Sequence, residues 1–140
     1  MKLTPIATRI KALVTDFSSV KAMASMPKPA TLLNRAPAAV VVPTGERGGG
    51  NTVATGIVQQ QNTFRFGVMH SFKDASDQKG GKSADGLAEI RDALKTALVG
   101  WKHPDADGAC LFDSGAVVSV DGAGLIWLDQ FTIPVIFRNT

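Results

Sequence analysis

The sequence predicts an α+β domain with a mainly antiparallel sheet and two helices packed against it, in the order helix, three strands, helix, two or three strands. Two segments carry apolar residues at helical spacing. The segments between and after them carry apolar residues at every second position or in short β-branched runs. The 140 residues and the hydrophobic content of 44% suit one packed core, so we expect a single domain over residues 1–140.

The first helix is predicted to begin near Thr4, which we expect to cap it, with Pro5 at the first helical position. Its apolar residues recur at helical steps and are Ile6, Ile10, Leu13, Val14 and Phe17. Charged residues lie between them, which predicts an amphipathic helix of about four turns. We expect this helix to end before Pro27.

A buried strand is predicted at residues 40–42, where three adjacent valines are followed by Pro43. A loop rich in proline and alanine, residues 25–37, leads into it. Residues 44–52 are rich in glycine, which loses much backbone entropy in a regular element. We therefore predict a mobile hairpin loop there.

Two further strands are predicted at residues 53–60 and 64–72, with a tight turn at Gln61 and Asn62 between them. The polar residues 73–83 form a second exposed loop. These strands complete the first group of three.

The second helix is predicted to begin at Asp85, which can cap it, and to end at Gly100. Its apolar face consists of Leu87, Ile90, Leu94, Ala97 and Leu98.

The last strands are predicted at residues 117–120 and 125–137, with a turn at residues 121–124. Both sides of the second segment are apolar, which indicates burial. Pro134 cannot donate a backbone hydrogen bond, so we expect a bulge, a break or a sheet edge there.

Composition excludes several classes of protein. The formal net charge is +3, from 15 Lys and Arg against 12 Asp and Glu, which is too small to indicate nucleic-acid binding by itself. Cys110 is the single cysteine, so no intramolecular disulfide is expected, and no Cys/His cluster is spaced to hold zinc. No signal-peptide pattern and no run of about 18 apolar residues is present. We expect an intracellular protein with no membrane attachment, no cofactor and no metal.

Enzymatic and nucleotide-binding patterns are weak. Gly80, Gly81, Lys82 and Ser83 are similar to the end of a P-loop, but Ser76 stands where that pattern requires glycine. A solvated loop is the favoured interpretation, and no catalytic residue is expected.

Two histidines and the cysteine are the side chains from which a nucleophilic site would be built. No local signature joins His70 or His103 to Cys110. We expect His70 to be a partly buried packing residue on a strand, and Cys110 to be a small core residue.

A nucleic-acid module would use aromatic stacking on a basic sheet face, for which Phe64, Arg65 and Phe66 give faint support. Phe64 and Phe66 share their side of the strand with Val68, which indicates a core position instead.

One group of residues resembles the phage tail terminator-like family. In that family a helix ends in an Ala-Leu-x-Gly-Trp turn, and a Trp-x-x-x-Phe strand follows near the C-terminus. This chain has Ala97, Leu98, Val99, Gly100 and Trp101, then Pro104, Gly124, Trp127 and Phe131. The first helix, the strand entry at residues 37–40 and the length agree too, so the resemblance covers nearly all of the chain.

The matching residues have a structural explanation of their own. Gly100 permits the left-handed turn that closes a helix, and Trp101 can then fold back over the helix end to seal the core. We therefore expect Gly100, Trp101, Trp127 and Phe131 to be structural.

The resemblance implies a homo-oligomeric ring, usually of six subunits, on the last ring of tail tube protein at the head-proximal end of the virion tail. Such a ring stops tube polymerisation and offers a surface to head completion or stopper proteins. It acts by binding and geometric closure, without covalent chemistry. Phage DNA would pass through its lumen without sequence-specific binding, and assembly would take place in the host cytoplasm.

Two segments are predicted to contact neighbouring proteins, because flexible polar or glycine-rich segments often become ordered on assembly. Their residues are Gly45, Glu46, Arg47, Gly48, Gly49, Gly50, Lys73, Asp74, Lys79 and Lys82. The alternatives left open are a neighbouring neck or head-completion protein of the connector, a small nucleic-acid-binding module and a small enzyme.

Overall fold

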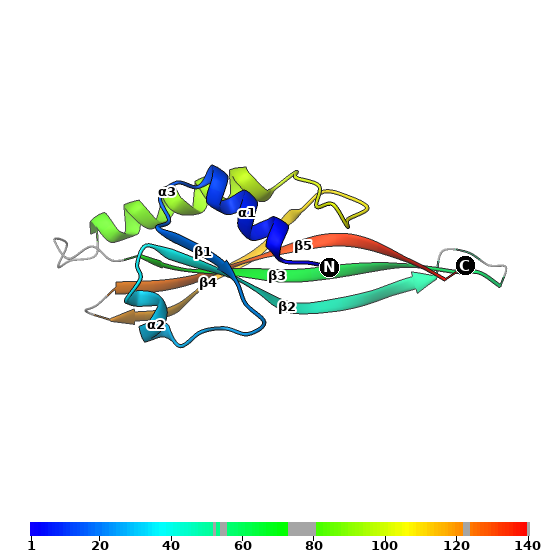
Figure 1. The fold of residues 1–140 in the computed structure, drawn as a ribbon, viewed down its shortest axis with the longest axis horizontal. Helices are drawn as coiled ribbons and strands as arrows, with labels where there is room; N and C mark the ends of the chain where they lie inside the picture. Colours follow the sequence, from blue (N-terminus) through cyan, green and yellow to red (C-terminus); the bar gives the residue numbers. More distant parts are fainter. Residues whose placement is uncertain (52, 54–55, 73–80, 122–123, 140) are drawn as a thin grey trace.

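The computed structural model describes residues 1–51, 53, 56–72, 81–121 and 124–139, without the side chains of residues 81–84 and 121. The elements in chain order are α1 (Thr4–Leu13), β1 (Ser19–Ala22), α2 (Pro29–Leu33), β2 (Ala38–Asn51), β3 (Val58–Phe72), α3 (Gly81–Leu98), β4 (Leu111–Asp121) and β5 (Gly124–Asn139). The strands form one sheet in the order β1-β2-β3-β5-β4. Figure 1 shows α1 and α3 on one face of this sheet and α2 on the other.

The predicted α+β class is confirmed, and the sheet is mostly antiparallel. β1 and β2 are its one parallel pair among the described strands. The predicted number and order of elements are wrong in detail, since α2 and β1 are additional elements before β2.

The main core lies between the sheet and the helices α1 and α3. Ile6, Ile10 and Leu94 of the helices are fully buried against Phe66 and Phe131 of the sheet. Phe66 and Phe131 stack with their ring centroids 5.5 Å apart. Because neighbouring strand residues point to opposite faces, the other face has its own smaller core under α2, formed by Leu32, Leu33, Ala38, Val40, Val42, Met69 and Ile126.

The first helix is shorter than predicted. α1 ends at Leu13, and Val14 leaves the helical conformation while its N–H still donates to Ile10 O at 2.8 Å. Val14 and Phe17 remain in the core, so their apolar spacing reflects burial and not a continued helix. The predicted cap at Thr4 is also wrong, because Leu3 occupies the N-cap position and Thr4 is already helical.

The region predicted as a Pro- and Ala-rich loop contains the short helix α2. It begins at Pro29, a residue suited to the first helical turn. Leu32 and Leu33 of α2 are buried against the second face of the sheet. The apolar character of these two leucines, and not helix propensity, explains why this segment is ordered.

The predicted glycine-rich hairpin loop is wrong. Residues 45–50 lie in β2, where Glu46 pairs with Phe64 and Arg47 pairs with Thr63 of β3. The register shifts between Pro43 and Gly45 and again between Gly48 and Asn51, so the strand accommodates its glycines through bulges. Pairing with β3 provides the backbone hydrogen bonds that offset the entropy cost of these glycines.

The predicted turn at Gln61 and Asn62 is also wrong. Both residues lie inside β3, where they pair with Ile136 and Val135 of β5. β2, β3 and β5 therefore extend as a three-stranded ribbon well beyond the helices, toward the C-terminal end of the molecule in Figure 1. This ribbon is the feature that gives the molecule its long axis.

The last two strands form the predicted hairpin, since Asp121 pairs with Gly124 at its end. β4 begins at Leu111, six positions earlier than expected, and β5 continues without a break through Pro134. β4 reaches only as far as Thr132, so Pro134 lies where no described strand borders the outer edge of β5. The expectation of a sheet edge at Pro134 is confirmed.

The second helix begins at Gly81, earlier than the predicted Asp85, so Asp85 lies within α3 instead of capping it. Its predicted end is confirmed, because α3 stops at Leu98 and Gly100 has a φ of 86°. Such a positive φ favours glycine and ends the helix.

Candidate assembly surfaces

The turn after α3 fastens the helix end to the start of β4. Gly100 N donates to Cys110 O and Cys110 N donates to Trp101 O, each at 2.8 Å. Trp101 is half-buried and packs against the main core. The His103 ring lies edge-on to the Trp101 ring, with centroids 5.5 Å apart.

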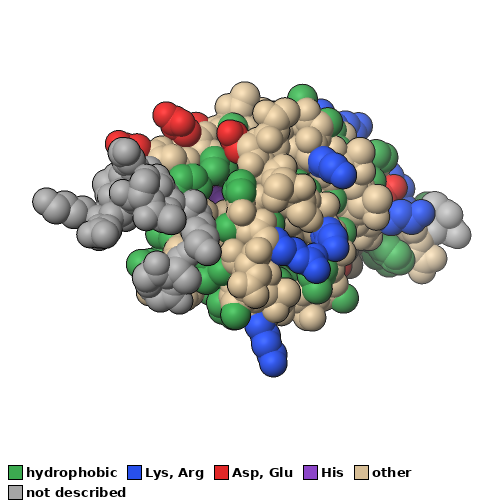
Figure 2. Space-filling view, turned by 60° about the vertical axis from the view of Figure 1, so that its left-hand side comes forward, with side chains coloured by type: hydrophobic (Ala, Val, Ile, Leu, Met, Phe, Trp, Pro, Cys, Tyr) green, Lys and Arg blue, Asp and Glu red, His purple; other side chains and the backbone are tan. Residues whose placement is uncertain are grey.

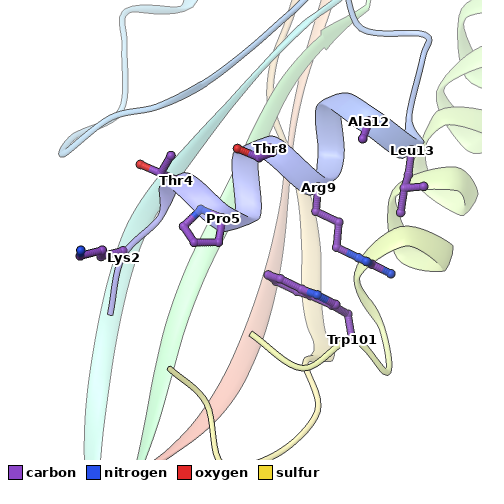
Figure 3. A pocket seen from close by; sticks show the side chains of 8 residues that line it. All are labelled: Lys2, Thr4, Pro5, Thr8, Arg9, Ala12, Leu13 and Trp101. Carbon is purple, nitrogen blue, oxygen red and sulfur yellow. The ribbon is translucent and has the colours of Figure 1, made fainter. Parts of the chain in front are cut away.

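A shallow groove runs between α1 and this turn (Figure 3). Arg9 lies over the indole of Trp101 at 5.2 Å from the ring centroid, and its Nε donates to Ala97 O at 2.6 Å. Pro5 and Leu13 form the apolar part of the lining, and Lys2 lies at one end. The groove combines an aromatic wall with two cationic side chains, and Arg9 is fixed in place by α3.

A buried charged cluster lies between α3 and the sheet, around Asp129 of β5. The fully buried carboxylate accepts hydrogen bonds from Arg91 Nη2 at 2.9 Å, Trp127 Nε1 at 3.0 Å and His70 Nε2 at 3.0 Å. Burial alone would raise the pKa of Asp129, but the hydrogen bonds from these three side chains and the charge of His70 outweigh burial and lower it. Asp129 is therefore held as a carboxylate that ties α3 to the sheet.

Three neighbours shape this cluster. Arg91 also lies over the ring of Trp127, 4.4 Å from its centroid, and Phe17 packs edge-on against His70. Gly115 of β4 leaves the room that the cluster needs, since a Cβ there would lie 2.6 Å from Asp129 Oδ1 and 2.7 Å from Arg91 Nη2. Asp129 and His70 at the centre of the cluster are fully buried, and Arg91 and Trp127 are partly buried, which indicates a structural role.

The outer strand β4 exposes Leu111 near one end and a group of valines near the other. Leu111, Val117 and Val120 are 56%, 51% and 68% exposed, and Val118 is also exposed. Large apolar patches on a protein surface often mark contacts with partner molecules. β4 is therefore a candidate assembly surface.

The ribbon of β2, β3 and β5 is a second candidate surface. The predicted assembly residues Gly45, Glu46, Arg47, Gly48, Gly49 and Gly50 are all exposed along β2. Of the second predicted segment, Lys73, Asp74 and Lys79 lie outside the described residues. Lys82 lies in the first turn of α3, and its side chain is likewise not described.

Charged side chains on the face in Figure 2 form separate groups. Acidic side chains gather at the upper left, whereas Lys and Arg side chains lie apart from one another over the rest of this face. Asp85, Glu89 and Asp92 are exposed at helical spacing and form an acidic stripe on α3. The basic residues Arg91 and Lys95 of the same helix point toward the sheet instead. Among the described residues of this face, the basic side chains form no continuous stripe of the kind that follows a nucleic-acid backbone.

A family model described as phage tail terminator protein matches residues 1–140. The chain belongs to the phage tail terminator protein family. Membership makes the protein a structural component of a phage tail, and it confirms the family that the Gly100–Trp101 turn and the Trp127–Phe131 strand indicated. A search of curated proteins gives no match.

The side chains considered for catalysis in this tail terminator do not form a joint site. His70 pairs with Asp129, whereas His103 donates from Nε2 to Lys2 O and accepts from Asp105 N at Nδ1. Cys110 is buried in the core, and burial raises the pKa of its thiol to about 12. Among the described residues no group of His, Cys, Asp and Glu is arranged to hold a metal ion.

The stacking platform considered for nucleic acid does not exist in this tail terminator. Phe66 is fully buried under the helices, and Phe64 packs partly against the same core, as their spacing with Val68 indicated. Arg65 forms an ion pair with Asp113 at 3.1 Å. No helix among the described residues is long and apolar enough to span a membrane.

Of the four predicted structural residues, Trp127 and Phe131 lie on the helix-facing side of β5, and Gly100 and Trp101 close α3. The Asp129 cluster was missed by sequence reasoning. The spacing of Trp127, Asp129 and Phe131 placed Asp129 on a core-facing side, and a buried acid requires partners. An acidic residue at a core-facing position of the strand was therefore the feature of the sequence that could have indicated the cluster.

Proposed function

We propose that the protein forms a homo-oligomeric ring, of six copies as the family resemblance implies, that caps the head-proximal end of the phage tail tube. The ring stops tube polymerisation and presents a surface for head completion proteins. Family membership over the whole chain is the observation that carries this proposal. Assembly would take place in the host cytoplasm, and the ring would remain in the virion tail.

The shape of the surface supports a role in assembly. A closed ring needs two different contact surfaces on each subunit, one for each neighbour. The chain has an exposed apolar strand, β4, on one side of the sheet and an exposed glycine-rich segment of β2 on the other side. In addition, the titratable core residues His70, Asp129 and Cys110 are enclosed by protein, which fits a function by binding and closure.

The contacts with the tube and with head completion proteins would involve the parts that project from the core. One of these is the ribbon, including residues 45–50. The predicted assembly residues Lys73, Asp74, Lys79 and Lys82 would contribute contacts as well. Phage DNA would pass through the lumen with loose contacts that do not depend on its sequence.

The test is to mix the purified protein with tail tubes and to examine them by negative-stain electron microscopy, with the mass in solution measured by light scattering. Rings on one end of each tube, with no further tube growth, are the expected result. Bare tubes that continue to grow would contradict tube capping and would favour a neck protein at the connector.

A further inference from the structure

β4 is an open edge strand, with irregularities between Phe112 and Ser114 and between Val117 and Ser119. Its outer side carries no backbone hydrogen bond from any described segment. Native proteins protect such edges with lysine, proline or a covering segment, because unpaired backbone groups template pairing with another strand. The eleven residues of β4 include no lysine, arginine or proline. The exposed side chains of Leu111, Val117 and Val120 add apolar surface to this edge.

The opposite side of the sheet has a second open edge. β1 covers only the beginning of β2, from Ala38 to Val41, and Met23 N donates the last backbone bond to Val41 O at 2.9 Å. Beyond that point, residues 42–51 of β2 have no outer backbone partner in the described part of the chain. This segment and β4 have nearly the same length, and glycines 48–50 leave its edge free of bulky side chains.

The two open edges run in opposite directions. Three antiparallel pairings, β2 with β3, β3 with β5 and β5 with β4, separate them. When two copies stand side by side in the same orientation, β4 of one copy therefore lies antiparallel to β2 of the next. We propose, on the basis of the ring proposed above, that neighbouring copies join by antiparallel pairing of β4 with residues 42–51 of β2.

This pairing requires a shift along the strands. Ala116, at the middle of β4, is at the same height along the sheet as Val40 of β2, as the pairing partners in β5 and β3 show. The middle of the open β2 segment lies further along, near Glu46 and Arg47. Full overlap requires neighbouring copies to be offset by about five to six residues, roughly 18 Å at about 3.3 Å per residue. The short strand β1 sets this offset because it blocks the level pairing.

The offset agrees with closure into a ring. Four strand-to-strand steps separate β2 of one copy from β2 of the next, roughly 19 Å at about 4.8 Å per step. An offset of roughly 18 Å over this width closes when the strands tilt by about 43° from the ring axis, and barrel strands typically tilt by about 35–45°. A continuous staggered sheet, four strands per copy, is thus geometrically reasonable.

Cysteine crosslinking tests the register. The offset brings Leu111 of one copy next to Gly50 of the other, and a Cβ at Gly50 meets nothing within 4 Å. We expect a mixture of Leu111→Cys and Gly50→Cys chains to form a mixed disulfide on oxidation at high protein concentration. The matched control is Val120→Cys with Gly50→Cys, which lie at opposite ends of the paired strands and should crosslink far less. Equal yields from both mixtures, or no mixed product from either, would overturn the pairing.

Edge-blocking variants test the same contact by another route. The double variant Val118→Lys/Val120→Lys places two lysines on the β4 edge and should reduce association at least tenfold in sedimentation experiments. The control Leu13→Lys/Val99→Lys makes the same change at two positions that are also exposed, 54% and 42%, but lie away from both edges. Equal association of the two variants, at matched thermal stability, would overturn the inference.

Tail tubes separate the inference from the proposed function. If the β4 lysine variant caps tubes as well as the wild type does, the ring forms through other surfaces and only the pairing is wrong. If the Leu111→Cys and Gly50→Cys chains crosslink in the predicted register but the wild-type chain leaves tubes bare, the pairing stands and the proposed function is wrong.

Discussion

Arg91 and Asp129 form a two-pronged ion pair that connects α3 to β5 in the interior of the protein. Arg91 Nε lies 3.1 Å and Nη2 lies 2.9 Å from Asp129 Oδ1. The Asp129 side chain is fully buried, whereas that of Arg91 is 22% exposed. Hydrogen bonds from its partners offset the free-energy cost of removing this carboxylate from water. Because Arg91 lies on α3 and Asp129 lies on β5, the position of α3 on the sheet depends on this small number of contacts.

Arg91→Ala should lower the free energy of unfolding by about 3 kcal/mol, because it removes the arginine partner from a buried carboxylate. Arg65→Ala is the matched control. It removes an ion pair with Asp113 whose side chains are 47% and 31% exposed, and it should cost less than about 1 kcal/mol. Urea unfolding of both variants measures the difference, and equal losses would contradict this account of the cluster.

The Asp129 carboxylate should also make stability depend on pH. Burial opposes ionisation, but the hydrogen bonds from His70, Arg91 and Trp127 and the charge of His70 lower its pKa in the folded state. The unfolded chain then binds the proton more readily, so the contribution of Asp129 is complete above about pH 5 and is lost as the pH falls through the lowered pKa. The stability difference between wild type and Asp129→Asn should therefore narrow below about pH 4. If the stability difference between the two proteins widened in acid, the pKa of Asp129 would be raised in the folded state and not lowered.

Gly115 should tolerate no side chain. The Cβ of alanine would lie 2.6 Å from Asp129 Oδ1, 2.7 Å from Arg91 Nη2 and 3.0 Å from Trp127 Nε1, so the cluster would have to move. We expect Gly115→Ala to cost about 1–3 kcal/mol in thermal or urea unfolding. Gly50→Ala, with open space around its Cβ, should change stability by less than about 0.5 kcal/mol.

The parts of the fold that could be predicted from the sequence are those in which local signals and burial agree. The apolar spacing of Leu87, Ile90 and Leu94 identified α3, and Gly100 identified its end. Val40 to Val42 likewise identified the buried part of β2.

The errors arose where pairing between distant segments outweighs local preference. Glycines 48–50 and the pair Gln61 and Asn62 have little strand propensity, yet they form the ribbon because β3 has a strand on each side. The spacing of Val14 and Phe17 was mistaken for helix because both residues point into the core from a non-helical segment. The candidate surfaces could be predicted only in part for the same reason, since the edges of β2 and β4 depend on the strand order.

Cys110 should be unreactive in the folded protein. It is fully buried, and burial raises the pKa of its thiol to about 12. Because only the thiolate attacks disulfide reagents, a chromogenic thiol reagent at about pH 8 should label Cys110 in denaturant and not in native buffer. Rapid labelling of the native wild type would show that the turn from Gly100 to Cys110 opens readily.

Trp101 should contribute less to stability than a fully buried tryptophan. It is half-buried, with Arg9 over its ring and His103 against its edge. Truncation of a fully buried aromatic residue to alanine lowers the free energy of unfolding by about 3–5 kcal/mol. For the half-buried Trp101 we expect Trp101→Ala to lower it by about 2 kcal/mol in urea unfolding. Leu13→Ala, a truncation at an exposed position in the same groove, should cost less than about 0.5 kcal/mol. A loss for Trp101→Ala as small as that for Leu13→Ala would mean that the indole does not seal the end of α3 and is free to serve a contact with another protein.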